Sequence, residues 1–130
     1  MIIIAAPPGG GKSTAFPVSE SGVDWFDADR RCAALNGDSF FAIPESVRQR
    51  SALELGEFIE THIADHQSFA FETTLRTGIT FEQATRARAA GFYVSMTFVG
   101  LGDPELHINR VSIRVDGGGH PAHPDQIRET

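Results

Sequence analysis

The sequence predicts a three-layer α/β fold, in which a mostly parallel sheet of about four strands is flanked by helices. Short apolar stretches alternate along the 130 residues with longer segments of helical periodicity. This alternation is typical of parallel strands joined by crossover helices. The first stretch, residues 1–5, is wholly apolar and ends at a run of prolines and glycines, which indicates a strand buried on both faces.

The remaining elements follow from the same signals. Further strands are expected at 23–26, 68–72 and 92–99, and helices at 12–16, 30–35, 46–67, 77–90 and 103–115, with one more beginning at 124. The longest helix, 46–67, has an apolar face and a candidate cap in Ser46. Gly91 is expected to end helix 77–90 in the C′ position. Residues 1–130 are expected to form a single domain with a lid segment at about 103–123.

Composition restricts the classes of function. The formal net charge of −6 argues against broad, non-specific binding to nucleic acid or to an anionic membrane. The single cysteine, Cys32, excludes an internal disulfide and a cysteine-based zinc site. No basic leader or long apolar stretch is present, so we expect neither a signal peptide nor a transmembrane helix, and a cytoplasmic location.

A phosphate-binding motif follows the first strand. Residues 6–13 read A-P-P-G-G-G-K-S, which matches G-x-x-x-x-G-K-[ST] with Ala6 in the place of the first glycine. The alternative is a glycine-rich turn with a chance match, but a strand before the motif and a helix after it are the context that confirms it. We therefore expect a P-loop NTPase fold.

Each part of this motif has a physical role in binding ATP or GTP. Gly9, Gly10 and Gly11 allow successive N–H groups to turn inward and form a nest for phosphate, and the start of the next helix adds its own N–H groups. Lys12 is expected to reach the β- and γ-phosphates. Ser13 is placed to ligate Mg²⁺, and Thr14 to lie near the α-phosphate.

Carboxylates follow two of the expected strands. Asp27 and Asp29 come after the second strand, and Glu72 ends the third. Because ligands of open α/β sheets bind beyond the carboxyl ends of the strands, these side chains should face the same crevice as the phosphate loop. Asp29 is the candidate base for an attacking hydroxyl, while Asp27 or Glu72 would support Mg²⁺. The alternative is that both aspartates only cap the next helix.

A basic segment lies near the end of this acidic chain. Arg110 and Arg114 are four residues apart and share a helix face, where they could close over a transferring phosphoryl group. A glycine run at 117–119 could act as the hinge of a lid. The alternative is a solvated helix face. The nearby histidines have no standard metal-ligand spacing.

Together these features resemble the zeta-toxin-like small P-loop kinases. The resemblance covers most of the chain and rests on PPGGGKST, on FDAD at 26–29, on FETTLR at 71–76, on AGFYVSMTFVGL at 90–101 and on NRVSIRVDGGGHPAHPDQI at 109–127. These motifs differ in specificity, because the phosphate-loop motif occurs in many families, whereas FETTL and the RV-x-x-RV-x-x-GGH pattern are much more specific.

The resemblance implies a kinase that phosphorylates a hydroxyl of a small-molecule acceptor with ATP or GTP and Mg²⁺. In zeta toxins proper the acceptor is a UDP-linked amino sugar. The family pattern implies that Asp29 is the base, that Glu72, Thr74 and Arg76 contact the acceptor and phosphates, and that Arg110 is a lid residue. The later lid residue aligns with Arg114 or near His120. An antitoxin-like protein is a further expected partner.

The chain differs from the family pattern in two respects, and two other functions are alternatives. Family members usually continue past the GGH segment into another helix and a final strand, so we expect this chain, which stops at Thr130, to be truncated. The helical region that recognises the sugar is also short here, between residues 36 and 67. Polynucleotide 5′-kinases also place D-x-D-R after the second strand, as at 27–30, although the net charge disfavours nucleic acid. The other alternative is a non-catalytic nucleotide-binding module.

Overall fold

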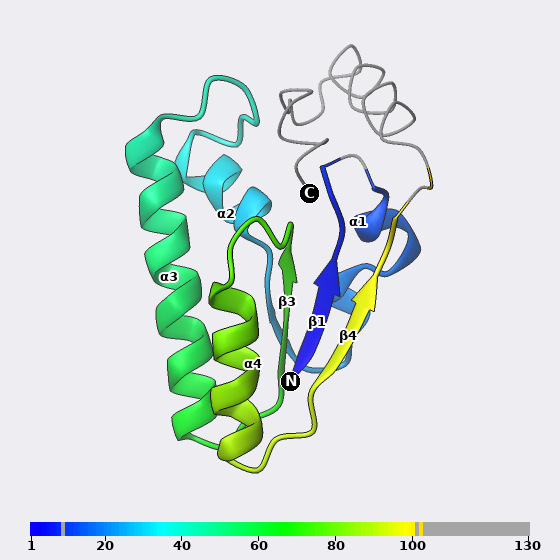
Figure 1. Ribbon diagram of the computed structural model, residues 1–130. Coiled ribbons are helices and arrows are strands. Elements are labelled where there is room, and N and C mark those ends of the chain that lie inside the picture. The colour runs from blue at the N-terminus through cyan, green and yellow to red at the C-terminus, as the bar shows by residue number, and fades with distance from the viewer. Residues whose placement is uncertain (9, 101, 103–130) are drawn as a thin grey trace.

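The architecture is a parallel sheet with helices on both faces. The computed structural model describes residues 1–8, 10–100 and 102, and all structural statements concern these residues. Within them the elements are β1 (Ile2–Ala5), α1 (Lys12–Ala15), η1 (Val18–Glu20), β2 (Asp24–Phe26), α2 (Ala28–Leu35), α3 (Glu45–Ala64), β3 (Phe69–Thr73), α4 (Ile79–Ala89) and β4 (Ser95–Phe98). The strands pair in parallel in the order β2-β3-β1-β4 (Figure 1). The predicted α/β fold is confirmed.

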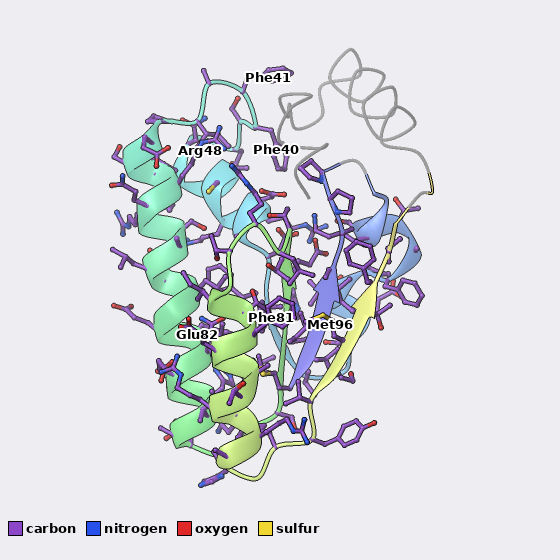
Figure 2. All side chains as sticks on the ribbon, viewed as in Figure 1. Phe40, Phe41, Arg48, Phe81, Glu82 and Met96 are labelled. Carbon is purple, nitrogen blue, oxygen red and sulfur yellow. The ribbon has the colours of Figure 1, made fainter. Side chains whose placement is uncertain are left out.

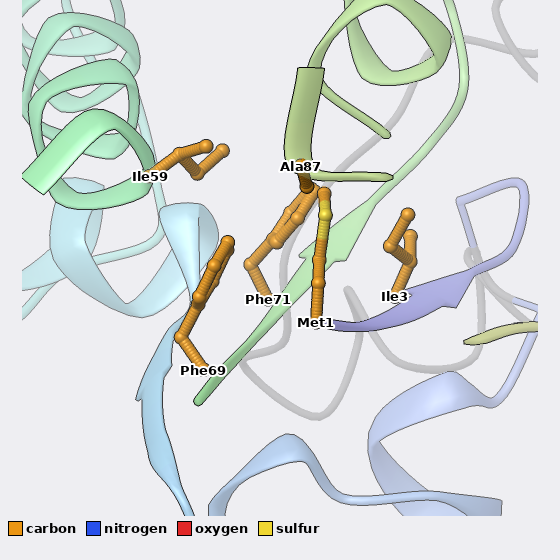
Figure 3. Packing of buried hydrophobic residues seen from close by; sticks show 6 residues of the cluster. All are labelled: Met1, Ile3, Ile59, Phe69, Phe71 and Ala87. Carbon is orange, nitrogen blue, oxygen red and sulfur yellow. The ribbon is translucent and has the colours of Figure 1, made fainter. Parts of the chain in front are cut away.

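One face of the sheet holds the main core, beneath α3 and α4. Side chains alternate along a strand, and Phe69 and Phe71 of β3 point to the same face as Ile3 of β1, which pairs with Phe71. Ile59 of α3 and Ala87 of α4 complete this cluster, and both are fully buried (Figure 3). The packing is largely aromatic, as in the edge-on contact of Phe58 with Phe69 at 5.9 Å between ring centroids.

On the opposite face of the sheet, η1 packs against β2 and β3. Ala70 and Glu72 alternate with the core phenylalanines, and Trp25 pairs with Ala70 in register, so all three belong to this second face. Val18 of η1 is 3% exposed, and η1 packs on β2 and β3. The sheet is therefore the middle of three layers.

Several predicted boundaries differ from the observed ones. Asp27 caps α2, which starts that helix at Ala28 rather than at residue 30. Ser46 does not cap α3, because the helix already begins at Glu45 after Pro44. That helix ends at Ala64, since His66 takes a left-handed conformation with φ of 52°. Gly91, at φ of 90°, does end α4 as predicted.

The fourth strand is shorter than predicted for a related reason. The N–H of Phe92 still bonds to the carbonyl of Ala87 in α4, at 3.0 Å, so the chain has not yet left the helix end. Pairing with the first strand starts where the Ser95 N–H donates to the carbonyl of Met1, at 3.0 Å. The helices expected at 103–115 and from 124, and the lid at about 103–123, lie outside the described residues. Within the described part of the chain, no helix combines the length and apolar character needed to cross a bilayer.

The core generates a stability prediction. Ile59→Ala should lower the free energy of unfolding by about 2–5 kcal/mol, because it removes a fully buried side chain and leaves a cavity between α3 and the sheet. Urea denaturation monitored by circular dichroism measures this change. Leu53→Ala, on the same helix but 70% exposed, is the matched control and should change stability by no more than about 0.5 kcal/mol. Equal losses in the two variants would contradict the assigned packing.

Candidate functional site

The phosphate loop leaves the carboxyl end of β1 and is shaped by small residues. Gly11 is at φ 84° and ψ 17°, a left-handed conformation that glycine adopts without strain. A Cβ on Gly10 would lie 2.8 Å from the Cβ of Ala6 and 2.9 Å from the carbonyl oxygen of Pro7, so this position has no room for a side chain. Ala6 is itself fully buried. The methyl group that replaces the first glycine of the motif is therefore accommodated because residue 10 is glycine.

The helix after the loop is short, as Pro17 predicted. α1 has 4 residues, and its first turn is closed by the N–H groups of Thr14 and Ala15, which donate to the carbonyl of Gly11 at 3.1 and 2.9 Å. A helix of this length adds little dipole. The groups that the loop offers to an anion are therefore its own N–H groups and side chains. Gly9 lies outside the described residues.

The two side chains that end the motif both contact Glu72, from the end of β3. The Lys12 ammonium lies 3.5 Å from the Glu72 carboxylate. The Ser13 hydroxyl donates to the same carboxylate, at 3.3 and 3.4 Å from its two oxygens. Glu72 is 5% exposed. A buried carboxylate thus holds the lysine and the serine of the phosphate loop together.

The charge on Glu72 is disfavoured by its surroundings. Burial raises the pKa of this carboxyl above its ordinary value of 4.5, and the negative charge of Asp27 raises it further. The ammonium of Lys12 and its hydrogen bond oppose the rise in pKa, as does the hydrogen bond from Ser13. Perturbed carboxyl groups of this kind, in a hollow beside a cation, are frequent at functional sites.

Asp27 caps the helix α2, whereas Asp29 does not. One oxygen of Asp27 accepts the N–H groups of Asp29 and Arg30, at 3.0 and 3.1 Å, so the capping interpretation is correct for Asp27. The Arg30 guanidinium lies 3.8 Å from the second oxygen of Asp27. Asp29 does not supply the cap; it lies in the first turn of α2, with its position set by that cap.

A hollow of about 180 Å³ joins these groups at the carboxyl ends of the strands. Its walls come from the phosphate loop, the start of α2, the end of β3 and the middle of α3, and the lining residues are Lys12, Asp27, Ala28, Asp29, Leu55, Glu72, Thr73 and Thr74. A smaller hollow of about 20 Å³ lies beside it, lined among others by Ser13, Trp25, Arg30 and again by Asp27 and Glu72. The two carboxylates therefore border both hollows.

The structure brings four of the predicted site residues together in one hollow. The larger hollow is lined by Lys12, Asp29, Glu72 and Thr74. Arg76 is exposed in the turn after β3 and is not among the lining residues. Arg110 and Arg114 lie outside the described residues.

Several residues that line the two hollows were not predicted as site residues, and Leu55, Thr73 and Trp25 are three of them. Leu55 was assigned to the core face of its helix, whereas it also reaches the hollow. Thr73 follows Glu72 directly, and its place at the end of a strand was the available signal. Trp25 precedes the acidic motif and stacks against Arg30, with 5.8 Å between the guanidinium carbon and the ring centroid.

The oxygen donors around the loop fit Mg²⁺. The Ser13 hydroxyl lies 3.3 Å from a Glu72 oxygen, and Asp27 lines the smaller hollow together with both residues. Among the described residues, no three or more His, Cys, Asp or Glu side chains are grouped so as to hold a metal by themselves. This arrangement suits an ion that takes one or two protein ligands and completes its shell with phosphate oxygens and water.

Comparison with known proteins places the fold. No family model matches the chain. A protein from Haemophilus influenzae, described only as uncharacterized, is 28% identical over 121 residues, which are 92% of this chain and 84% of that protein.

Three solved structures match at a TM-score of 0.71 over 98% of this chain: the Pnkp1/Rnl/Hen1 RNA repair complex at 17% identity, a presumed kinase from Chloroflexus aurantiacus at 18%, and the PezAT toxin-antitoxin system of Streptococcus pneumoniae at 16%. The chain spans 41%, 75% and 59% of those chains, respectively. The chain therefore shares the α/β fold of these three proteins.

The burial of Glu72 predicts a pH-dependent stability. A carboxyl group whose pKa is higher in the folded than in the unfolded state contributes stability at low pH, and that contribution is lost as the pH rises through the folded value. Glu72→Gln should therefore gain stability relative to the native chain as the pH rises from 4.5 to neutrality, measured by urea unfolding at each pH. A stability of Glu72→Gln, relative to the native chain, that stays constant or falls as the pH rises would contradict the raised pKa of Glu72.

Glu54 is the control, because its pKa is shifted in the opposite direction to that of Glu72. The Arg31 guanidinium, which hydrogen-bonds to it, lowers the pKa of Glu54 to about 2. Its contribution to stability is present above the ordinary value of 4.5 and is lost as the pH falls toward 2. Glu54→Gln should lose stability at neutral pH, with a loss that shrinks on acidification.

The crowding at Gly10 predicts that the loop tolerates no side chain there. Gly10→Ala should weaken binding of Mg-ATP by more than about tenfold, because the added methyl would displace backbone atoms of the phosphate loop. Fluorescence titration with an ATP analogue measures the affinity. Gly56→Ala, where an added Cβ meets nothing within 4 Å, is the control: it should leave affinity unchanged and raise stability by about 0.5–1 kcal/mol. Unaltered affinity in Gly10→Ala would contradict the role of the loop.

Proposed function

We propose that the protein is a kinase that transfers the γ-phosphate of ATP or GTP to a hydroxyl group of a small molecule. The observation that carries the proposal is the convergence of Lys12, Asp29 and Glu72 on one hollow beside the phosphate loop. A phosphate anchor, a carboxylate for the attacking hydroxyl and oxygen donors for a metal are the parts that phosphoryl transfer requires. The likeness in fold to a presumed kinase from Chloroflexus aurantiacus supports it.

In this proposal each group acts on a defined part of the reaction. Lys12 leaves its ion pair with Glu72 to bind the β- and γ-phosphates, and Ser13 would hold Mg²⁺ together with Asp27 or Glu72. The metal would neutralise charge that develops on the phosphate oxygens. Asp29 accepts the proton of the acceptor hydroxyl and orients it in line with the γ-phosphate. The contacts of Glu72 with Lys12 and Ser13 favour the phosphate side of the site over the acceptor side considered for it.

The acceptor side of the site is the turn after β3 together with the loop between α2 and α3. Thr74 lines the hollow, and Arg76 follows it in the same turn. The loop carries Phe40 and Phe41, which lie at the end of the molecule toward which the strands point (Figure 2). We propose that this side binds a nucleotide sugar, as the resemblance to zeta toxins implies. The likeness to the PezAT toxin-antitoxin system supports an antitoxin-like protein partner.

The proposal also includes the extent of the domain, a lid and the location of the protein. Residues 1–130 would form one unit, in which Arg110 and Arg114 of a lid at about 103–123 close over the transferring phosphate. These residues lie outside the described part of the chain. A cytoplasmic location supplies both ATP and nucleotide sugars.

A polynucleotide 5′-kinase is the second candidate. Asp27, Asp29 and Arg30 form the D-x-D-R pattern at the carboxyl end of β2, and Arg30 stacks on Trp25 beside the smaller hollow. The similarity to a chain of an RNA repair complex favours this function specifically. Transfer of labelled phosphate from ATP to an oligonucleotide with a 5′-hydroxyl, compared with transfer to UDP-N-acetylglucosamine, separates the two candidates.

The base assignment gives a kinetic prediction. Asp29→Asn should lower kcat by about 10²–10⁴-fold, because the amide cannot accept the proton of the hydroxyl, and it should leave the affinity for Mg-ATP unchanged. Phosphate transfer over a panel of nucleotide sugars, sugars and 5′-hydroxyl oligonucleotides measures kcat. Asp65→Asn, at the exposed carboxyl end of α3 and on the side of the sheet where β3 begins, is the matched control and should retain full activity.

Three outcomes decide between kinase and binding module. Tight Mg-ATP binding with no transfer to any acceptor in the panel would favour a non-catalytic nucleotide-binding module. Transfer that survives in Asp29→Asn would remove Asp29 as the base. Transfer that is lost in this variant, with binding intact, supports the proposed role.

A further inference from the structure

Thr73, the last residue of β3, connects three parts of the site. Its carbonyl accepts the N–H of Ala6, at 3.2 Å, where the phosphate loop begins. Its hydroxyl accepts the N–H of Leu75, at 3.1 Å, in the turn that follows the strand. The same hydroxyl lies 3.3 Å from the hydroxyl of Thr80 in the first turn of α4. One residue thus ties the phosphate loop, the turn and a helix together.

The turn needs such a connection because its backbone is strained. Leu75 has φ of 53°, a left-handed conformation that a residue with a branched side chain adopts at a cost in free energy. Strain of this kind persists where surrounding contacts hold it, and it concentrates at functional sites. The hydrogen bond from the Leu75 N–H to Thr73 is the contact that opposes relaxation of the turn. Thr74, between these two residues, lines the larger hollow.

The buried hydroxyl of Thr80 completes this arrangement. Thr80 is 6% exposed, so its hydroxyl needs a partner within the protein. A hydroxyl has one donor hydrogen and two acceptor lone pairs. Thr73 can therefore accept the Leu75 N–H and still share a hydrogen bond with Thr80. Without the Thr80 hydroxyl, the Thr73 side chain loses the contact that fixes its rotation toward Leu75.

We propose that Thr80 is a positioning residue, which acts through Thr73 to hold Leu75 in its left-handed conformation and so places Thr74 against the acceptor. Thr80 does not line the hollow itself. The kinetic consequence of this inference rests on the proposed kinase function, whereas its structural consequence does not. The two are therefore tested separately.

The structural test measures exchange of the Leu75 amide hydrogen by NMR in the full chain without nucleotide. Thr80→Val keeps the shape of the side chain and removes the hydroxyl, and we expect the amide to exchange about tenfold faster, as for loss of one hydrogen bond. Thr80→Ser keeps the hydroxyl and should preserve the native rate. Thr80→Ala gives the same comparison if valine disturbs the helix. Native exchange rates in both hydroxyl-free variants would overturn the inference, whatever the activity.

The kinetic test uses ATP and UDP-N-acetylglucosamine. Thr80→Val should raise KM for the acceptor about fivefold to tenfold and leave KM for ATP unchanged, with recovery in Thr80→Ser. Leu75→Gly relieves the strain, because glycine adopts the left-handed conformation freely, so it should restore acceptor KM when combined with Thr80→Val. Equal changes in both KM values would indicate general loosening and overturn the positioning role.

The two tests fail in different ways. No phosphorylation of UDP-N-acetylglucosamine by the native chain would count against the nucleotide-sugar proposal, and the exchange rates would then decide the inference alone. Faster exchange at Leu75 with an unchanged acceptor KM would overturn the placement of Thr74 while leaving the kinase function intact.

Discussion

The site depends on the parallel pairing of β1 with β3. In this register Ile4 pairs with Glu72 and Ala5 with Thr73, so the two strands reach the same edge of the sheet together. One strand continues into the phosphate loop and the other into the turn that holds Thr74. The hydrogen bond from the Ala6 N–H to the Thr73 carbonyl extends the pairing by one residue beyond the paired strands. A shift of one residue in this register would turn Glu72 to the opposite face, away from Lys12 and Ser13.

The pairing places a charged group where an apolar one would be more stable. Ala70 and Glu72 share the second face of the sheet, and Glu72 is buried there although burial disfavours its ionised form. Its contacts with Lys12 and Ser13 offset part of that cost. Leu75, whose backbone is left-handed, directly follows Thr74 of the same hollow. A buried charged group and a strained backbone, each unfavourable for stability, thus occur together beside one hollow. This combination is common at functional sites.

The sequence predicted the elements within the described residues better than it predicted their ends. Buried strands and the long helix α3 have strong patterns over several residues. Their ends depend on single contacts, such as the Asp27 cap of α2. The start of β4 depends on a hydrogen bond between residues far apart in sequence, from Ser95 to Met1. Local periodicity contains no information about such a partner.

The sequence by itself determined the phosphate loop, the α/β alternation and the carboxylates at the strand ends, because each of these is written in consecutive residues with their own conformational preferences. Only the tertiary structure decided the strand order β2-β3-β1-β4, the choice of Glu72 as the partner of both Lys12 and Ser13, and the hydroxyl pair of Thr73 and Thr80. Strand order depends on how the helices pack across the sheet. The contact of Glu72 with Ser13 joins residues 59 positions apart. The contact between Thr73 and Thr80 depends on the left-handed turn between them. A non-glycine residue forms that turn, so the sequence does not indicate it.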